Sequence, residues 1–448
     1  MVFQRRGLAR LAAATLAALL AGTALNGCGG SGDSPADDPC AAYRAYQGHD
    51  GTTVSILSPI RDVESDKLAR AWETLEECSG ITIDYQGTDT FEKRLPAQAH
   101  AGRAPDLAVF PQPGLLREMV EEGYVKPVSP AVNELALRGW SADWLRYARV
   151  GDTLYAAPLD ASVKSLVWYS PRWFREKGYT VPRTWPELMT LTKRIADDGV
   201  TPWCAGIESG VATGWPVTDW LEDVLLRTSG AGVYDDWVNH KISFTDPRVV
   251  EALDQVGTIL RNPRYVNGGY GGVRSMTTIS FQEGGLPILE RKCAMHRQAS
   301  FYANWWPENA TVGESGDIYA FYLPPMPGRA GPAKPVLGAG NFVAAFNERP
   351  EVTAVATYLA SPEFANEHAR TGEAISGNRG LDPASLKQPV ARLSAELLRA
   401  SDVTFRFDGS DLMPASVGSG TFWRGMTEWI NGAGSREVLA EIQRSWPD

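Results

Sequence analysis

Short catalytic signatures are missing from this 448-residue sequence. It contains no G-x-x-x-x-G-K-[ST] phosphate loop, no H-E-x-x-H zinc-protease motif and no G-x-S-x-G nucleophile elbow. Gly338-Ala339-Gly340 lacks the third glycine of a dinucleotide fingerprint. The sequence therefore gives no support for these three kinds of catalysis, and we expect no cofactor.

Histidine and cysteine are also scarce, with five of each, and they do not have the spacing of metal ligands. There is no C-x-x-C and no close histidine pair, so we expect no metal site. Zinc remains the rival explanation for the cysteines. A catalytic pair of carboxylates for glycoside hydrolysis remains an alternative, because the chain has 53 acidic residues. Only the distance between two carboxyl groups in the fold decides whether such a pair exists.

Basic residues are fewer than acidic ones: the chain has 43 lysines and arginines and 53 aspartates and glutamates, so its net charge is −10. Residues 1–27 hold three of the arginines and no acid, so their removal would give −13. This acidity argues against a nucleic-acid partner and against a polybasic contact with anionic lipid.

The first 27 residues form a targeting segment with an arginine-containing start and an apolar run at 11–20. The run is too short to be read confidently as a membrane span. The sequence Leu25-Asn26-Gly27-Cys28 resembles a bacterial lipobox, in which Cys28 becomes the lipidated first residue. We expect an exported protein held on the outer face of the cell membrane by this lipid, with 28–39 as a tether. The alternative is a plain signal peptide with a stray cysteine.

Four further cysteines, Cys40, Cys78, Cys204 and Cys293, suggest two disulfides in an exported chain. Four cysteines allow three pairings. We favour Cys40–Cys78 and Cys204–Cys293, because each pair then lies on one side of the chain's central stretch.

That central stretch, residues 154–170, contains two apolar runs with no helix between them. Before it, strands at 53–57, 81–85 and 106–110 alternate with helices at 62–78, from 89 and at 114–122. After it the alternation resumes, and 334–346 is a second apolar crossing, followed by a predicted helix from 351 to 369. This pattern predicts two α/β units, each with a mainly parallel sheet. An ordinary connection between strands within one domain is the alternative reading of 154–170.

Polar residues follow two of the predicted strands, Asp89 after 81–85 and Gln112 after 106–110. In open α/β sheets, ligands bind in the crevice at the carboxyl ends of the strands. We therefore expect Asp89 and Gln112 to contact a ligand.

Tryptophan is abundant, with 15 residues, and several lie beside carboxylates and glycines. Examples are Trp215 with Asp219, the pair at 305–306, and the segment 408–414, which contains Asp408 and Asp411. An indole offers an apolar face to a sugar ring, and a carboxylate accepts hydrogen bonds from its hydroxyls. We expect these four residues to contact a sugar in a cleft, although core packing explains most single tryptophans.

Five features together resemble a known family: the lipobox, APLDASVKSLVWYSPRWF at 157–174, CAMHRQASF at 293–301, LGAGNFVAAF at 337–346, and FDGSDLMP at 407–414 with the following TFW. The chain is similar to the extracellular solute-binding proteins of carbohydrate ABC transporters, in particular the α-glucoside-binding subgroup. The resemblance implies a periplasmic-binding-protein-like fold of two doubly wound α/β lobes joined by a hinge. It also implies capture of a sugar without reaction and delivery to the transporter's permease subunits, with closure driven by contacts to both lobes.

The resemblance also suggests ligand contacts at Asp160, Lys164, Gln298 and Trp423, and the cleft argument adds Arg379. We place lobe 1 at 40–160 and 336–378 and lobe 2 at 161–335 and 379–448, and we expect a monomer. Two alternatives remain open: a receptor of this fold for a polyamine or other small solute, and an exported carbohydrate-active hydrolase.

Overall fold

The computed structural model describes residues 38–326, 334–372 and 375–447. Residues 43–448 form one compact unit, and the description below concerns that unit. Cys28 and the targeting segment lie outside the described residues. No helix in the described part of the chain combines the length and the apolar character needed to cross a membrane.

The strands are β1 (Thr53–Ser58), β2 (Thr82–Gly87), β3 (Leu107–Phe110), β4 (Arg149–Val150), β5 (Thr153–Leu154), β6 (Ala156–Pro158), β7 (Ser162–Val163), β8 (Leu166–Tyr169), β9 (Thr201–Trp203), β10 (Cys293–Arg297), β11 (Tyr319–Tyr322), β12 (Lys334–Ala339), β13 (Phe342–Ala345) and β14 (Val403–Phe407). The helices are α1 (Asp62–Arg70), α2 (Glu73–Ser79), α3 (Phe91–His100), α4 (Pro113–Glu121), α5 (Pro130–Gly139), α6 (Ala142–Leu145), α7 (Pro171–Lys177), α8 (Trp185–Asp197), α9 (Trp215–Val238), α10 (Pro247–Leu260), α11 (Pro350–Leu359), α12 (Pro362–Arg370), α13 (Pro389–Arg399), α14 (Gly409–Leu412), α15 (Trp423–Ile430) and α16 (Ser435–Arg444).

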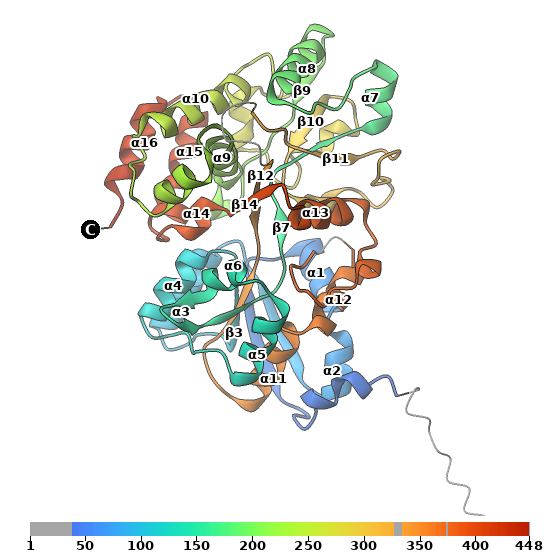
Figure 1. The fold of residues 1–448 in the computed structure, drawn as a ribbon, viewed down its shortest axis with the longest axis vertical. Helices are drawn as coiled ribbons and strands as arrows, with labels where there is room; N and C mark the ends of the chain where they lie inside the picture. Colours follow the sequence, from blue (N-terminus) through green and yellow to red (C-terminus); the bar gives the residue numbers. More distant parts are fainter. Residues whose placement is uncertain (1–37, 327–333, 373–374, 448) are drawn as a thin grey trace, which may run out of the picture. The chain divides into compact units, whose positions relative to one another are not determined.

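Two separate sheets form the cores of two lobes (Figure 1). The sheet of lobe 1 has the order β2-β1-β3-β13-β6, with β1 parallel to β2 and β3, and β13 antiparallel to β3 and β6. The sheet of lobe 2 has the order β11-β8-β10-β9, with β8 antiparallel to both β11 and β10, and β10 parallel to β9. The prediction of a mainly parallel sheet is therefore wrong for lobe 2, because β8 runs against both of its neighbours. All five strands of the first sheet fall within the ranges predicted for lobe 1, and all four of the second within those for lobe 2. The α/β fold in two lobes is therefore confirmed, while the exact boundaries stay a prediction.

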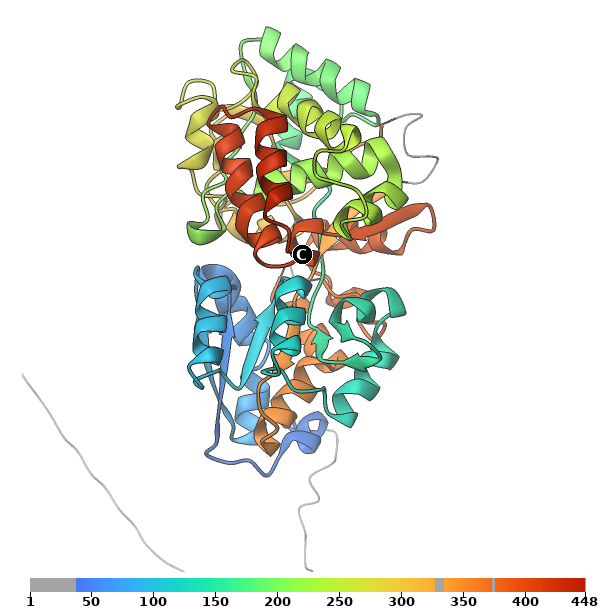
Figure 2. The same cartoon turned by 90° about the vertical axis from the view of Figure 1, so that its left-hand side faces the viewer.

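The central stretch contains β6, β7 and β8, which belong to three different sheets rather than to one. Strand β6 belongs to lobe 1, β7 to a third sheet of order β14-β12-β7, and β8 to lobe 2. Strand β12 continues into β13 and returns the chain to lobe 1. Figures 1 and 2 both show blue and orange segments in one lobe and green and red segments in the other. Each lobe is thus built from stretches far apart in sequence, which excludes the single-domain reading of 154–170.

Two helices predicted as continuous are broken. The predicted helix 62–78 is α1 and α2, because Trp72 leaves helical geometry and is buried against Tyr85, with ring centroids 5.6 Å apart. The predicted helix from 351 to 369 is α11 and α12. Ser361 there caps α12 by accepting a hydrogen bond from the backbone N–H of Phe364, and Pro362 takes the first helical position.

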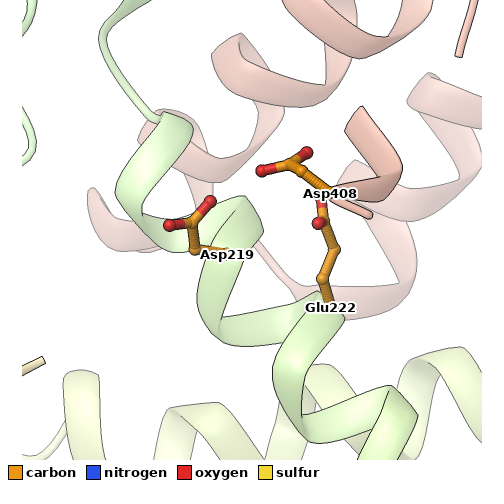
Figure 3. A group of neighbouring side chains, drawn as sticks. All are labelled: Asp219, Glu222 and Asp408. Atoms are coloured by element: carbon orange, nitrogen blue, oxygen red, sulfur yellow. The ribbon is translucent and has the colours of Figure 1, made fainter. Parts of the chain in front are cut away.

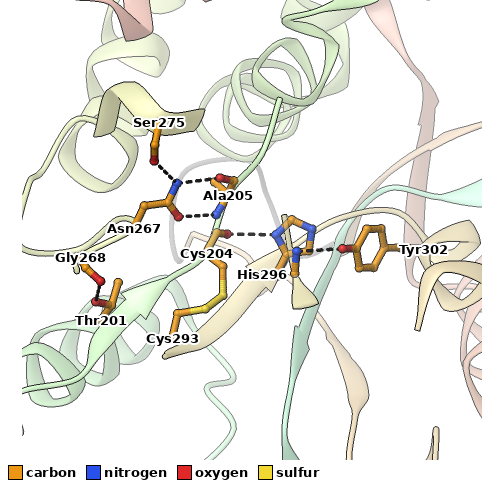
Figure 4. The surroundings of a disulfide bond; sticks show 10 residues. Thr201, Cys204, Ala205, Asn267, Gly268, Ser275, Cys293, His296 and Tyr302 are labelled. Atoms are coloured by element: carbon orange, nitrogen blue, oxygen red, sulfur yellow. Dashed lines mark hydrogen bonds between the residues drawn. A yellow bond between two sulfur atoms is a disulfide. The ribbon is translucent and has the colours of Figure 1, made fainter. Parts of the chain in front are cut away.

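One predicted disulfide, Cys204–Cys293, is confirmed, with Cα atoms 5.6 Å apart (Figure 4). It joins the end of β9 to the start of the adjacent strand β10. Buried His296 lies beside it. Burial lowers the pKa of this histidine to about 4, and its neutral ring donates from Nδ1 to the carbonyl of Cys204 at 3.0 Å. Cys40 and Cys78 are disulfide-bonded as well, and their pairing with each other stays a prediction.

Candidate functional site

A cavity of about 260 Å³ is lined by residues from both lobes and from the crossing segments between them. Eight of the eleven residues predicted to bind a ligand line it: Asp89, Gln112, Asp160, Lys164, Trp215, Asp408, Asp411 and Trp423. Side chains separated by more than 300 residues in sequence thus meet in one concave site, which is the usual form of a small-molecule site.

The lobe 2 side of the cavity carries an aromatic cluster that we call the aromatic wall, formed by Trp215, Phe281, Phe301 and Trp305. The rings of Trp215 and Phe281 are 5.2 Å apart at 69°, and those of Phe281 and Trp305 are 6.0 Å apart at 79°. All four side chains are half-buried, so each keeps some surface open. Such a surface can pack against the apolar face of a sugar ring.

Trp215 and Trp423 are brought together by a close backbone contact. Trp215 begins α9 directly after Gly214, and Trp423 begins α15. A Cβ on Gly214 would lie 2.0 Å from the carbonyl oxygen of Trp423, and the φ of Gly214 is +114°. Only glycine fits both conditions, so this residue sets the distance between the two tryptophan-bearing helices.

The lobe 1 side is polar and is formed by residues that follow β2 and β3. Asp89 precedes α3, Glu92 is the second residue of α3, and Gln112 is the residue before α4. The Nε2 of Gln112 donates to Oε1 of Glu92 at 3.0 Å. Burial raises the pKa of Glu92, against the opposing effect of its hydrogen bonds. This wall offers hydrogen-bonding groups opposite the aromatic wall.

Asp160 and Asn341 join the two crossing segments at the cavity. Asp160 precedes β7, and Asn341 lies between β12 and β13. The Asn341 backbone N–H and Nδ2 donate to Oδ1 of Asp160 at 3.0 and 2.9 Å, and Nδ2 also reaches Oδ2 at 3.0 Å. Burial raises the pKa of Asp160, although these bonds oppose the rise. Asp160 therefore ties the crossings to each other in addition to lining the cavity.

Lys164 lies beneath the aromatic wall in a buried ion cluster. Its ammonium donates to Oδ1 of Asp219 at 2.9 Å and to Oδ2 of Asp408. It also lies 5.2 Å from the ring centroid of Trp215. Burial disfavours the ammonium, but the two carboxylates outweigh it and hold the pKa of Lys164 well above its usual range. Lys164 is thus a permanent cation already held by protein partners.

The carboxyl groups of this cluster differ in pKa. Burial raises the pKa of Asp219 to about 6 even though Lys164 opposes the rise. At Asp408, Lys164 and local hydrogen bonds overcome burial, so its pKa lies below its usual value. Burial and the charge of Asp408 raise the pKa values of Glu222 and Asp411 well above their usual range. Both carboxyls therefore hold a proton more readily than exposed carboxyls do.

A second layer of charge extends the cluster into lobe 2. Arg297 donates to Oδ2 of Asp219 at 3.2 Å and to Oδ2 of Asp223 at 2.9 Å. Arg227 also pairs with Asp223. In this cluster each of the three aspartates, Asp219, Asp223 and Asp408, thus contacts at least one buried cation, as a buried carboxylate requires.

Asp219, Glu222 and Asp408 have carboxylate oxygens within 4.8 Å of one another (Figure 3), a spacing that could hold a cation. Their oxygens already have donors in the protein. Lys164 donates to both aspartates, and the backbone N–H groups of Gly409 and Ser410 donate to Glu222 at 2.7 and 3.0 Å. The ammonium of Lys164 thus takes the place that a metal would need.

Three predicted contact residues lie away from the cavity. Asp219 is fully buried below it, in the ion cluster. Gln298 is buried behind it, where its carbonyl oxygen accepts from the indole N–H of Trp168 at 3.0 Å. Arg379 is exposed, and its backbone N–H donates to Gly139 at the end of α5. The structure does not place these three at the cavity, because sequence order does not give side-chain depth, and ligand contact by them stays a prediction.

Several cavity residues carry no clear signal in the sequence. Phe281 and Phe301 lie in segments without a periodic pattern, and Glu92 was hidden in a predicted helix. Trp305 belonged to a tryptophan pair noted in the sequence but was not chosen.

The lobes also touch at the edge of the cavity. Nζ of Lys67 in α1 donates to Oδ1 of Asn304 in lobe 2 at 2.7 Å. Near α4, Oε1 of Glu118 accepts from the backbone N–H of Ala415 at 2.7 Å. The cavity is therefore bounded by direct contacts between residues of the two lobes.

Comparison with known proteins gives consistent matches. Residues 63–285 match the family model of the bacterial extracellular solute-binding proteins. The osmoprotective compounds-binding protein GgtB of Synechocystis sp. is 41% identical over 399 residues, covering 89% of this chain and 93% of that protein. The alpha-glucosides-binding periplasmic protein AglE of Rhizobium meliloti is 36% identical, covering 89% and 88%.

Solved structures share the fold at much lower identity. The bacterial solute receptor AcbH has a TM-score of 0.73 at 18% identity, over 89% of this chain and 97% of that one. A chitin oligosaccharide binding protein has a TM-score of 0.74 at 17% identity, over 89% and 98%.

Proposed function

Because the chain belongs to the bacterial extracellular solute-binding proteins, as its motifs indicated, we propose that it is the receptor subunit of an ABC importer for sugars. The ligand is an α-glucoside or another oligosaccharide, which the receptor binds unchanged and delivers to the permease subunits. The two relatives described above are named as binding proteins, one of them for alpha-glucosides.

The observation that carries this proposal is the pairing of an aromatic wall with a polar wall across one cavity. Trp215 and its neighbours supply apolar ring faces from lobe 2, while Asp89, Glu92 and Gln112 supply hydrogen-bonding groups from lobe 1. A sugar has both an apolar C–H face and a rim of hydroxyls, so it satisfies both walls at once.

Export follows from the family, and we further propose that Cys28 carries a lipid that anchors the receptor to the outer face of the cell membrane. The receptor acts as a monomer in this proposal. Replacement of Cys28 by alanine in the exporting cell tests the anchor. The lipidated protein is expected in the membrane fraction and Cys28→Ala in the soluble fraction, and equal distribution would refute the anchor.

The ligand class is tested by thermal unfolding of the purified mature protein with separate α-linked sugars and with spermidine. Binding to the native state alone raises the melting temperature. We expect a rise with at least one α-glucoside and none with spermidine. A rise with spermidine alone would favour a polyamine receptor, which the cavity carboxylates could also suit. Release of smaller sugars from a labelled oligosaccharide would instead indicate a hydrolase.

A further inference from the structure

The side-chain amide of Gln112 has one polar atom without a partner in the protein. Gln112 is only 5% exposed and lines the cavity from lobe 1. Its Nε2 donates to Glu92, whereas its Oε1 is buried and has no hydrogen-bond partner among the described residues. A buried acceptor of this kind is costly unless something else supplies a donor.

Glu92 fixes the orientation of this amide. Glu92 accepts the N–H of Gln112, and this bond stabilises its ionised form against the effect of burial. In that form the carboxylate accepts hydrogen bonds and cannot donate them. It therefore attracts the NH₂ group of Gln112, whereas the reversed amide would bring two acceptor oxygens together. Glu92 is held by α3, and Gln112 lies between β3 and α4, so both backbones belong to regular elements or their caps. The carbonyl end of Gln112 is consequently the end left without a partner.

We propose that Oε1 of Gln112 accepts a hydrogen bond from one particular hydroxyl of the bound sugar, and that Glu92 is a positioning residue which holds the amide in that orientation. This inference rests on the proposed sugar binding and adds a rule of specificity. The site selects a sugar with a hydroxyl donor at this point and rejects one with an ether oxygen or a fluorine there, because the carbonyl would then stay unpaired.

Calorimetric titration tests the rule at pH 8. Maltose, sucrose, trehalose and methyl α-glucoside are titrated first, and the tightest binder is then compared with its full set of monodeoxyfluoro derivatives. Each derivative replaces one hydroxyl by an atom that cannot donate. For the wild type we expect one derivative to bind roughly 10- to 100-fold more weakly than the parent through loss of this contact.

In Gln112→Met this particular loss of affinity should disappear, while the losses of affinity caused by fluorine at other ring positions remain. Gln86→Met is the matched control, because Gln86 lies on β2 of the same sheet but is exposed and does not line the cavity. It should reproduce the wild-type profile.

Glu92→Gln separates positioning from general structural support. A glutamine at position 92 can donate to Oε1 of Gln112 and let the amide reverse, so that its NH₂ group faces the ligand. The derivative that the wild type rejects should then bind nearly as well, relative to the parent sugar, as the other derivatives do, whatever the change does to the affinity for the parent. Circular dichroism confirms that each variant is folded.

The inference is wrong if Gln112→Met keeps the derivative profile of the wild type, or if Glu92→Gln recovers no affinity for the rejected derivative. The proposed sugar receptor would stand in either case. If none of the four sugars binds the wild type, the α-glucoside function and this inference both fail.

Discussion

Replacement of Lys164 by methionine tests whether the buried ion cluster holds the floor of the site. Methionine keeps much of the side-chain length but removes the cation from between Asp219 and Asp408. Removing one partner of a buried ion pair costs about 3 to 5 kcal/mol, because the other charge is left buried and unpaired. For a folded unit of about 400 residues this corresponds to a fall in melting temperature of roughly 4 to 6 °C.

The loss of stability in Lys164→Met, relative to wild type, should depend on pH. In the wild type the folded-state pKa of Asp408 lies below its usual value of 3.8, so this carboxylate stabilises the fold above that pH and its contribution is lost on acidification. Without Lys164, burial raises the pKa of Asp408 instead. The variant then loses stability as pH rises above 3.8, and its deficit should be larger at pH 7 than at pH 5.

Differential scanning calorimetry at the two pH values measures this deficit. Lys193→Met is the matched control, because Lys193 pairs with Asp197 on the surface and such pairs contribute little, about 0 to 1 kcal/mol. Lys164→Met with Asp408→Asn should recover part of the loss, since the second change removes the unpaired charge. A melting temperature of Lys164→Met within about 1 °C of wild type at pH 7 would refute the reasoning, because a fall of several degrees is predicted.

Three further predictions follow from contacts at other places. Trp215→Ala should weaken sugar binding roughly 10- to 100-fold in calorimetric titration through lost apolar burial, and unchanged affinity would remove Trp215 from the site. Asp160→Ala should weaken binding and, by leaving donors of Asn341 unpaired, cost about 1 to 3 kcal/mol in urea unfolding, whereas Asp160→Asn should cost less. Joint replacement of Cys204 and Cys293, 89 residues apart, by alanine should cost about 4.5 kcal/mol in the free energy of unfolding, and an unchanged free energy in urea unfolding would contradict this.

The fold was predictable because strands and helices alternate simply in the first half of lobe 1, and because the two crossings between the lobes are apolar runs. The breaks in the helices show where this reading ends. Ser361-Pro362 is a start signal for a helix that the sequence does contain and that the longer pattern concealed. The break at Trp72 has no such local signal, since it results from the burial of that indole against Tyr85 on a neighbouring strand. Tertiary packing overrides local periodicity there.

The site was predictable only in part, for a related reason. Trp215, Asp408 and Asp411 stood out because each lies in a short segment of unusual composition, and all three line the cavity. The partners of the polar residues could not be read in the same way. Lys164 and Asp219 are 55 residues apart and pair with each other beneath the surface, so their charges are used inside the protein.

The two lobes offer different kinds of contact to a ligand, because different residues line the cavity from each lobe. The aromatic wall belongs to lobe 2, and the polar wall of Asp89, Glu92 and Gln112 belongs to lobe 1. A ligand held by one wall alone gains either apolar contact or hydrogen bonds, and only a state in which both walls reach it gains both. A ligand shifts a conformational equilibrium by its difference in affinity for the two states. In the proposed receptor, mutations on either wall should therefore weaken closure as well as binding, whereas removal of Lys164 should act mainly through stability.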